Sequence, residues 1–250
     1  MFEEILTQIQ SLTPALVLTL GLVIGLRHAF EPDHIAAVST QISIQKNNSQ
    51  SLKQRIMEGA FKSSLIGAIW GAGHTTTLVL IGLLVYVLSI NIPEVFFSGS
   101  EFLVGIMLIF LAFTTLSNKK LFKIKHMHPH THEGSIVHTH PHEHDGVHKH
   151  THKSYLIGCI HGLAGSGALV VVAAAALNSV QEVLSFILIF GFGSVIGMVL
   201  VSSLIGIPFA LSKKTSSLNQ TLRFVTAAVS FLIGCTIIYE VAFVEKLFNF

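Results

Sequence analysis

The chain has 250 residues, of which 51% are hydrophobic and only 11% are charged. Soluble domains carry about 25% charged residues, so this composition and the mean hydropathy of +0.68 exclude an ordinary soluble globular protein. The formal net charge of +2 is too small to indicate a nucleic-acid partner. Long apolar runs recur along the chain, which predicts an all-α polytopic membrane protein whose partner is the lipid bilayer.

Six apolar segments can be drawn, each close to the ~20 residues that span a bilayer. They cover residues 12–40, 63–90, 101–116, 154–177, 183–211 and 222–244. A proline, Pro32, interrupts the first of them. We therefore expect about six transmembrane helices, with the first helix broken at Pro32.

Positive charge is distributed unevenly over the connections between these segments. Thirteen of the 15 Lys and Arg residues lie in, or within two residues of, the connections that follow the first, third and fifth segments; the exceptions are Arg27 and Lys246. The positive-inside rule places these three connections in the cytoplasm and both termini outside. The expected location is therefore the cell membrane.

Three short motifs of the first half recur in the second half: GLRH at 25–28 and GCIH at 158–161, WGAGH at 70–74 and FGFGS at 190–194, FLVG at 102–105 and FLIG at 231–234. Because each half holds three segments, the second half must be inverted in the membrane. Such 3+3 inverted repeats with interrupted helices are typical of secondary transporters, whose sites lie near the midplane. The alternative is chance similarity among Gly-rich helices.

The two repeats leave a polar stretch between them. We expect a first three-helix repeat over residues 1–118, a disordered cytoplasmic loop over 119–153, and a second repeat over 154–250. The loop contains eleven of the 15 histidines: His126, His128, His130, His132, His138, His140, His142, His144, His148, His150 and His152. We interpret it as a metal buffer, sensor or relay, and as a candidate docking site for a metallochaperone.

One stretch of the first segment departs from the apolar pattern, since residues 27–34 read RHAFEPDH. It holds five ionisable side chains and a proline. An Arg or Asp at the centre of a membrane helix costs about 2.5–3.5 kcal/mol on insertion scales, so such clusters mark functional sites. We therefore take this stretch as the centre of a candidate binding site.

Four histidines lie inside apolar segments rather than in the loop: His28, His34, His74 and His161. We expect His28 and His74 roughly halfway across the membrane and His161 nearer the cytoplasmic end of its segment. A single intramembrane histidine is more often a hydrogen-bonding residue between helices. Four of them together with Asp33 indicate a metal site, because imidazole is a ligand for nickel, copper, zinc and iron.

The spacing within the cluster does not converge on a regular helix. Residues five apart differ by about 140° and residues six apart by about 120°, so His28, Asp33 and His34 would not share a face. Pro32 has no N–H for the carbonyl of His28, and its ring clashes there, which predicts a kink or an unwound turn. An unwound turn allows the three side chains to point inward together.

Neighbouring residues are candidates for supporting roles. Asp33 either binds metal directly or orients a histidine ring. Arg27 and Glu31 are placed to form an ion pair, which lowers the cost of burying both. Thr75, next to His74, either lines a path for the ion or donates to a carbonyl of its own helix.

Residues 27–37 (RHAFEPDHIAA) look like the H-x4-D-H signature of the nickel/cobalt transporter family (NiCoT/NicO), and residues 73–76 (GHTT) resemble that family's G-H-[ST]-T motif. The resemblance implies transport of Ni²⁺ or Co²⁺. It assigns metal recognition to four residues: His28, Asp33, His34 and His74.

Three features set the chain apart from the eight-helix permeases of this family. It has about six segments. Residues 31–32 (EP) resemble the H-x-x-E-P-x-H version found in nickel/cobalt efflux relatives, which also have His-rich loops. Residues 161–167 (HGLAGSG) look closer to a urease-accessory-like branch. The class of metal is therefore better defined than the direction of transport.

The leading hypothesis is a secondary transporter, not an enzyme, that imports Ni²⁺ or Co²⁺ by alternating access, with the metal as cargo and no resident cofactor. The same architecture run outward is an exporter. A membrane metal-dependent enzyme would need a further acid or base and an open coordination position, and the sequence contains neither H-E-x-x-H nor G-x-S-x-G. A metal sensor or a partner subunit of a larger transporter is the third class.

Overall fold

The computed structural model describes residues 14–45, 51–87, 92–117, 148–164, 177, 179–212, 215–245 and 247. Within these ranges the backbone is helical almost throughout and forms no strand. The helices are α2 (Pro14–His28), α3 (Pro32–Ser43), α4 (Leu52–Val87), α5 (Glu94–Leu116), α6 (His148–Leu163), α8 (Val180–Ser212) and α9 (Ser216–Tyr239), followed by the π-helical turn η1 (Glu240–Val244). The all-α prediction is confirmed for this part of the chain.

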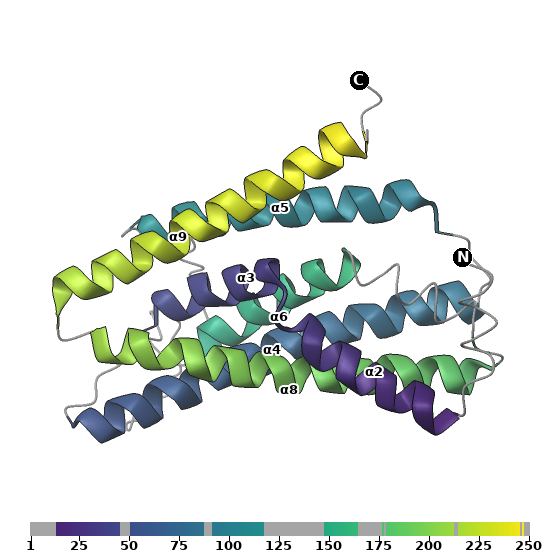
Figure 1. Cartoon of the computed structure of the whole chain (residues 1–250), viewed down its shortest axis with the longest axis horizontal. Helices are drawn as coiled ribbons and strands as arrows, with labels where there is room; N and C mark the ends of the chain where they lie inside the picture. The colour runs from purple at the N-terminus through teal and green to yellow at the C-terminus, as the bar shows by residue number, and fades with distance from the viewer. Residues whose placement is uncertain are drawn as a thin grey trace, which may run out of the picture.

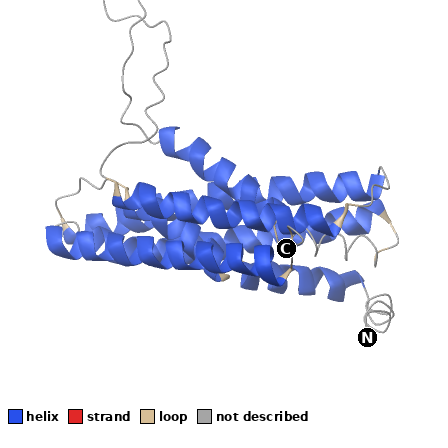
Figure 2. Cartoon of the chain, turned by 90° about the horizontal axis from the view of Figure 1, so that it is seen from above, coloured by secondary structure: helices blue, strands red, loops and turns tan. Residues whose placement is uncertain are grey.

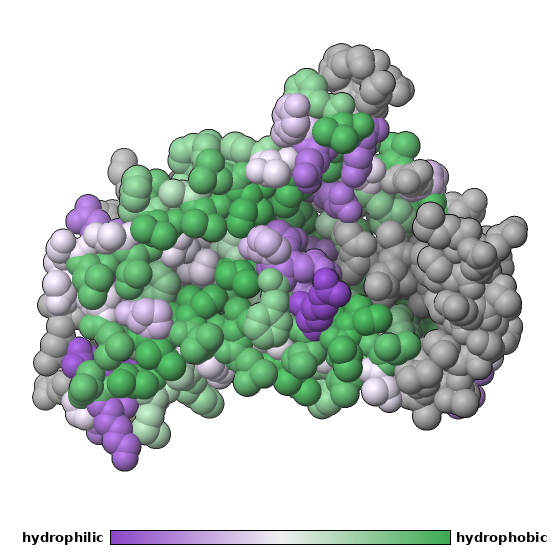
Figure 3. Space-filling view, viewed as in Figure 1, coloured by the Kyte–Doolittle hydropathy of each residue, from purple (hydrophilic) through white to green (hydrophobic). Residues whose placement is uncertain are grey.

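Four stretches of helix are long and apolar enough to cross a membrane: Leu52–Val85, Val95–Leu116, Val180–Ser212 and Ser216–Val244. Their outward faces carry large apolar side chains such as Phe61 and Leu204, each 70% exposed. Figure 3 shows hydrophobic residues over most of the face in view. Lipid rather than water is the solvent that suits such a surface, and the chain is a multi-pass membrane protein.

The helices do not coincide with the segments drawn from hydropathy. Helix α4 begins at Leu52 rather than at residue 63, and α5 begins at Glu94 rather than at residue 101. The first segment is two helices, α2 and α3, as the proline predicts. Helix α6 begins inside the loop that we expected to be disordered, so that expectation is wrong for residues 148–153. The second half of the fourth segment lies outside the described residues.

Two long helices, α4 and α8, lie side by side along the long axis and run in opposite directions (Figure 1). Helix α2 packs against α8, and α6 packs against α4. Helices α5 and α9 pair with each other and lie over α3. Figure 2 shows from a second direction that the helices extend along roughly one axis. The break between α2 and α3 therefore falls near the middle of the molecule.

Polar contacts hold the far end of α3 in place. The Gln41 side-chain oxygen accepts a hydrogen bond from Ser154 Oγ of α6 at 2.7 Å. The Gln45 side-chain amide donates to the carbonyl of Lys62 in α4 at 3.0 Å. Buried polar groups of this kind are stabilising only when paired. These bonds fix α3 against α4 and α6, the two helices that supply the other histidines.

Glycines let the backbones of the paired helices touch. A Cβ added to Gly25 of α2 would lie 2.0 Å from the carbonyl oxygen of Phe190 in α8. A Cβ added to Gly158 of α6 would lie 2.0 Å from the carbonyl oxygen of Trp70 in α4. Small residues at membrane-helix interfaces permit this approach. The two contacts bring the ends of α2 and α6 onto the central helices.

The substitution Gly158→Ala should lower the thermal stability of the purified protein in detergent. The new methyl group meets backbone atoms, which cannot rotate away, so the free energy of unfolding should fall by about 1–3 kcal/mol. Gly99 of α5 is the matched control, because an added Cβ there meets nothing within 4 Å. The Gly99→Ala variant should unfold at or above the wild-type temperature, since alanine favours helix. Equal midpoints for the two variants would contradict the close packing of α6 on α4.

Candidate metal centre

The interruption of the first segment has a regular local structure. The amide of Phe30 donates to Arg27 O at 2.9 Å and that of Glu31 to His28 O at 3.0 Å, which tightens the last turn of α2. Glu31 has an extended backbone with φ −63° and ψ 143°, the conformation favoured before proline. Pro32 then opens α3, where a missing N–H is tolerated. The predicted break is confirmed, and it lies just before the proline.

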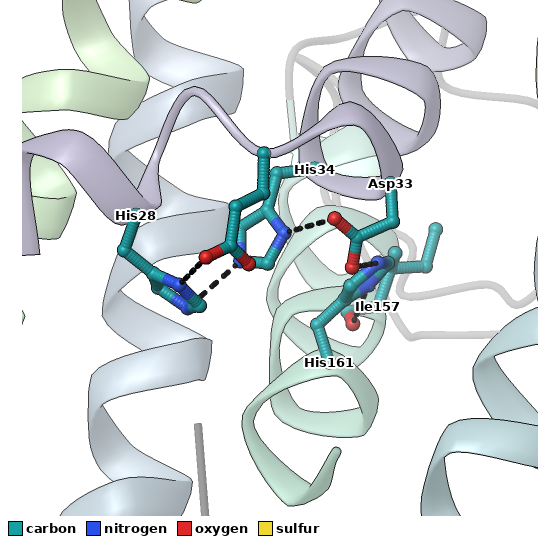
Figure 4. Close-up of polar contacts among 6 residues, drawn as sticks. His28, Asp33, His34, Ile157 and His161 are labelled. Carbon is teal, nitrogen blue, oxygen red and sulfur yellow. Dashed lines mark hydrogen bonds and ion pairs between the residues drawn. The ribbon is translucent and has the colours of Figure 1, made fainter. Parts of the chain in front are cut away.

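This break brings the rings of His28 and His34 into contact in an edge-to-face arrangement, with their Nε2 atoms next to each other (Figure 4). Their Nε2 atoms are 3.1 Å apart, and their ring centroids are separated by 4.4 Å. On a continuous helix the two side chains would diverge by about 120°. The unwound turn is therefore what makes the pair possible.

Carboxylates hold the other nitrogen of each ring. His28 Nδ1 is 2.9 Å from Glu31 Oε1, and His34 Nδ1 is 2.9 Å from Asp33 Oδ1. An ionised carboxylate only accepts hydrogen bonds, so both Nδ1 atoms carry the proton. In neutral rings both Nε2 atoms then present lone pairs to each other. A cation between them converts this repulsion into coordination, as in carboxylate–histidine–metal arrangements.

His74 approaches the pair from α4. Its ring centroid is 5.2 Å from that of His28 and 5.4 Å from that of His34. The side chain is fully buried, and neither ring nitrogen has a hydrogen-bond partner in the described part of the chain. An unpartnered buried polar group costs about 1–3 kcal/mol. Coordination of a metal ion is the interaction that would satisfy this imidazole.

His161, predicted toward the cytoplasmic end of its segment, joins the same cluster from α6. Its ring centroid is 5.2 Å from that of His34, and its Nε2 is 3.8 Å from Asp33 Oδ2 (Figure 4). Nδ1 donates to the carbonyl of Ile157 in its own helix at 3.4 Å. Gly162 allows the approach, because a Cβ there would lie 2.6 Å from the carbonyl oxygen of His74.

The five residues predicted as metal ligands therefore lie together. Their donor atoms form two triads, each with all atoms within 4.8 Å of one another: His28, His34 and His74; Asp33, His34 and His161. Three imidazoles, or two imidazoles and a carboxylate, suit borderline first-row divalent ions such as Ni²⁺, Co²⁺ and Zn²⁺. The arrangement has the chemistry of a site for such an ion.

Sequence reasoning did not identify Trp70 as part of the site. Its ring stacks on His74 at 5.2 Å with an interplanar angle of 13°, and it lies 4.9 Å from His34 and 5.1 Å from His161. The side chain is fully buried. The sequence feature that could have identified it is the four-residue spacing between Trp70 and His74, since residues four apart share a helix face. Trp70 forms an apolar wall that excludes water from the imidazoles.

The cluster reaches the surface at the break. The Glu31 side chain is 51% exposed, and Arg27 is exposed as well. Figure 3 shows a hydrophilic patch near the middle of the molecule, where α2 gives way to α3. The expected ion pair between Arg27 and Glu31 is not formed in the described part of the chain, because Glu31 contacts His28 instead. The two charged side chains therefore lie at the surface beside the buried histidines.

The other residues predicted for the site, Thr75 and the loop histidines, do not belong to the two triads. Thr75 donates to the carbonyl of Gly71 in its own helix at 2.8 Å, which favours the second of its two predicted roles. Of the loop histidines, those from His126 to His144 lie outside the described residues. His148 and His150 lie in the first turns of α6, and His152 is exposed there.

Comparison with known proteins relates most of the chain to a membrane family. The family described as the cytochrome c biogenesis protein transmembrane region matches residues 71–238. The urease accessory protein UreH of Bacillus sp. (strain TB-90) is 36% identical over 233 residues, which cover 93% of this chain and 95% of that protein. The chloroplast protein FOR GROWTH AND FERTILITY 1 of Arabidopsis thaliana is 25% identical over 222 residues, which cover 87% of this chain and 57% of that protein. No solved structure matches the chain.

The similarity to UreH extends over nearly the full length of both proteins, so it includes both halves of the helix arrangement rather than one motif. The match to a transmembrane region agrees with the four helices that are long and apolar enough to cross a membrane. The chain therefore belongs to the family of the urease accessory protein UreH, and its residues 71–238 match the cytochrome c biogenesis protein transmembrane region.

Proposed function

We propose that the chain transports Ni²⁺, with Co²⁺ as an alternative cargo, by binding the ion in the histidine cluster at the break of the first segment. The observation that carries the proposal is the pair of Nε2 atoms of His28 and His34, 3.1 Å apart, with both Nδ1 atoms held by carboxylates. The cluster lies between helices of a multi-pass membrane protein, where ionisable residues mark ion pathways.

The choice of nickel rests on two further considerations. The stretch from His28 to His34 resembles the metal signature of the nickel/cobalt transporter family, and the donor set is dominated by imidazole, which suits Ni²⁺. The 36% identity to a urease accessory protein fits a role in supplying nickel for urease maturation. Geometry selects the ion, since the Irving–Williams order alone would favour copper.

Support for alternating access comes from contacts that repeat between the two halves. Gly25 packs closely against the backbone of Phe190, and Gly158 packs in the same way against the backbone of Trp70. Gly25 and Gly158 are 133 residues apart in the sequence, and Trp70 and Phe190 are 120 residues apart, which are the separations of the recurring motifs. A 3+3 inverted repeat exchanges α2 with α6 and α4 with α8, and it places the cluster at the interface between the repeats. Rocking of one repeat against the other would then open the cluster to each side in turn.

A second set of glycines follows the same rule. A Cβ added to Gly73 would lie 2.1 Å from the carbonyl oxygen of Tyr155, and one added to Gly193 would lie 2.4 Å from that of Leu22. In the outer pair of helices the exchange maps Gly105 onto Gly234, and each meets the carbonyl oxygen of the other at 3.0 and 2.7 Å. These matched approaches support a duplicated unit rather than chance similarity among Gly-rich helices.

The orientation of the proposed transporter follows from the distribution of positive charge. Both termini lie outside, and the His-rich loop lies in the cytoplasm. Imported metal would leave the cluster toward this loop, where a metallochaperone could receive it. Weak binding through several ligands allows the ion to leave as well as to enter.

Expression of the chain in cells that lack their own nickel transporter should produce net accumulation of radiolabelled nickel above that of cells carrying the empty vector. The inward direction follows from the proposed supply of nickel to a cytoplasmic enzyme. Faster loss of nickel from preloaded cells would identify an exporter instead. No flux in either direction, with the protein present in the membrane, would favour a sensor or a metal-dependent enzyme.

A further inference from the structure

We propose that the histidine cluster consists of two half-sites for one divalent cation, which share His34 through its opposite ring nitrogens. The first half-site is formed by His28, His34 Nε2 and His74. The second is formed by Asp33, His34 Nδ1 and His161. The proposal deepens the proposed function, because it describes two successive positions of the same cargo ion.

The position of His34 carries this inference. Its Nε2 faces His28 Nε2 at 3.1 Å, and its Nδ1 faces Asp33 Oδ1 at 2.9 Å. The two nitrogens of one imidazole point in different directions, so no single ion can use both. Each triad has its donor atoms within 4.8 Å of one another. Each nitrogen of His34 therefore has its own pair of companion ligands.

The second half-site uses a carboxylate that already spans two imidazoles. Asp33 Oδ1 contacts His34 Nδ1, and Asp33 Oδ2 is 3.8 Å from His161 Nε2. His161 Nε2 is fully buried and has no hydrogen-bond partner in the described part of the chain. Its Nδ1 donates to Ile157 O, which leaves the lone pair on Nε2 and directs it toward the carboxylate. A cation between these groups would bind all three.

Occupation of the two half-sites is mutually exclusive while His34 is neutral. A neutral imidazole has one N–H and one free lone pair. With the ion in the first half-site, Nδ1 keeps the proton and donates it to Asp33. With the ion in the second, the ring is the other tautomer: the proton given up at Nδ1 is matched by one bound at Nε2, which donates to the lone pair of His28 Nε2, so the ring gains or loses no net proton. The ion thus moves past His34 by exchanging one nitrogen for the other.

The two half-sites draw on equivalent positions of the two repeats. His28 ends α2, and His161 lies 133 residues later on α6, the separation of the recurring GLRH and GCIH motifs. Both rings contact His34, at centroid distances of 4.4 and 5.2 Å. Helix α2 packs on α8, whereas α6 packs on α4. His28 of the first repeat therefore completes one half-site and His161 of the second repeat completes the other.

Trp70 provides a probe for both half-sites. It is the single tryptophan of the chain, and its ring lies 5.2 Å from His74, 4.9 Å from His34 and 5.1 Å from His161. Ni²⁺ bound to either triad should quench its fluorescence at short range. The full-length protein in detergent would be titrated with Ni²⁺ alone. The His-rich loop is the same in every variant, so its contribution cancels in the comparison.

The test compares His74→Asn, His161→Asn and the double variant. Each single variant should keep saturable quenching, because the other half-site is intact, whereas the double variant should bind Ni²⁺ more than about 100-fold more weakly. If His74→Asn alone removes the quenching, or if adding His161→Asn to it changes nothing, the second half-site does not exist. The variant His161→Gln replaces His161→Asn in the pair if the latter does not fold.

The quenching experiment tests the two half-sites, whereas nickel flux in cells tests transport, so each proposal can fail without the other. Two half-sites seen by quenching, without nickel flux in cells, would overturn transport and leave the half-sites standing. Nickel accumulation with a single half-site would overturn the present inference and leave transport standing.

Discussion

Replacement of His34 by alanine should abolish nickel accumulation while the chain is still inserted in the membrane at the wild-type level. The ring of His34 contacts those of His28, His74 and His161, so its loss removes a ligand from both triads. Loss of a residue that only hydrogen-bonds to a metal ligand lowers metal affinity or activity about 10–100-fold. Loss of His34, a ligand shared by both triads, should lower nickel uptake by more than about 100-fold. Radiolabelled nickel uptake, normalised to the amount of protein in the membrane fraction, measures the effect.

The control must separate lost coordination from lost packing. His34 is buried, and a cavity in a core destabilises a protein by itself. The variant His34→Gln keeps more of the volume and should be equally inactive. Thr76→Ala changes an exposed side chain on α4 whose hydroxyl donates to the Ala72 carbonyl of its own helix, and this variant should transport normally. Uptake by His34→Gln at the wild-type rate would remove His34 from the site.

The sequence predicted the centre of this site because the features that mark it, charged residues and a proline within an apolar segment, act on the backbone locally. Charged residues in an apolar segment are costly wherever the segment packs. Pro32 removes a hydrogen-bond donor and restricts Glu31, whatever the rest of the chain does. The observed break, with Glu31 extended and Pro32 opening α3, follows from these two effects. Convergence of His28 and His34 could therefore be derived without knowledge of any other helix.

Contacts between helices were harder to predict, because hydropathy does not give the rotation or height of one helix against another. The sequence indicated only that three helices could bring histidines to a similar depth, whereas the contact between the rings of His161 and His34 depends on the close approach of Gly158 and Gly162 to α4. Trp70 was recognised only as part of a recurring motif. Its contact with three histidines depends on how α4 faces α3 and α6, which no local pattern determines.

Helix length was underestimated for a different reason. Lys53, Arg55 and Lys62 made the second segment begin at residue 63 when only hydropathy was considered, but α4 begins at Leu52. Hydropathy marks the part of a helix that suits lipid, whereas charged residues such as Lys and Arg are good helix formers. The helix therefore continues beyond the apolar segment.

Pro32→Ala should remove most nickel binding and transport, although no ligand is changed. Alanine restores the N–H that can donate to the carbonyl of His28, and it frees Glu31 to adopt helical dihedral angles. A continuous helix would then turn His28 and His34 about 120° apart and separate the Nε2 atoms that now lie 3.1 Å apart. We expect quenching of Trp70 by Ni²⁺ and nickel accumulation both to fall by more than about 10-fold.

The matched control for this change is Pro208→Ala, which removes an exposed proline inside α8. It restores a backbone donor in the same way but leaves the turn between α2 and α3 intact, so quenching and accumulation should match the wild type. If Pro32→Ala also behaved as the wild type, packing of α3 against its neighbours, with the Gln41 and Gln45 bonds, would hold the break without the proline. The proline would then favour a conformation that the fold imposes. Loss of function in Pro32→Ala alone would show that one imino acid makes the metal site possible.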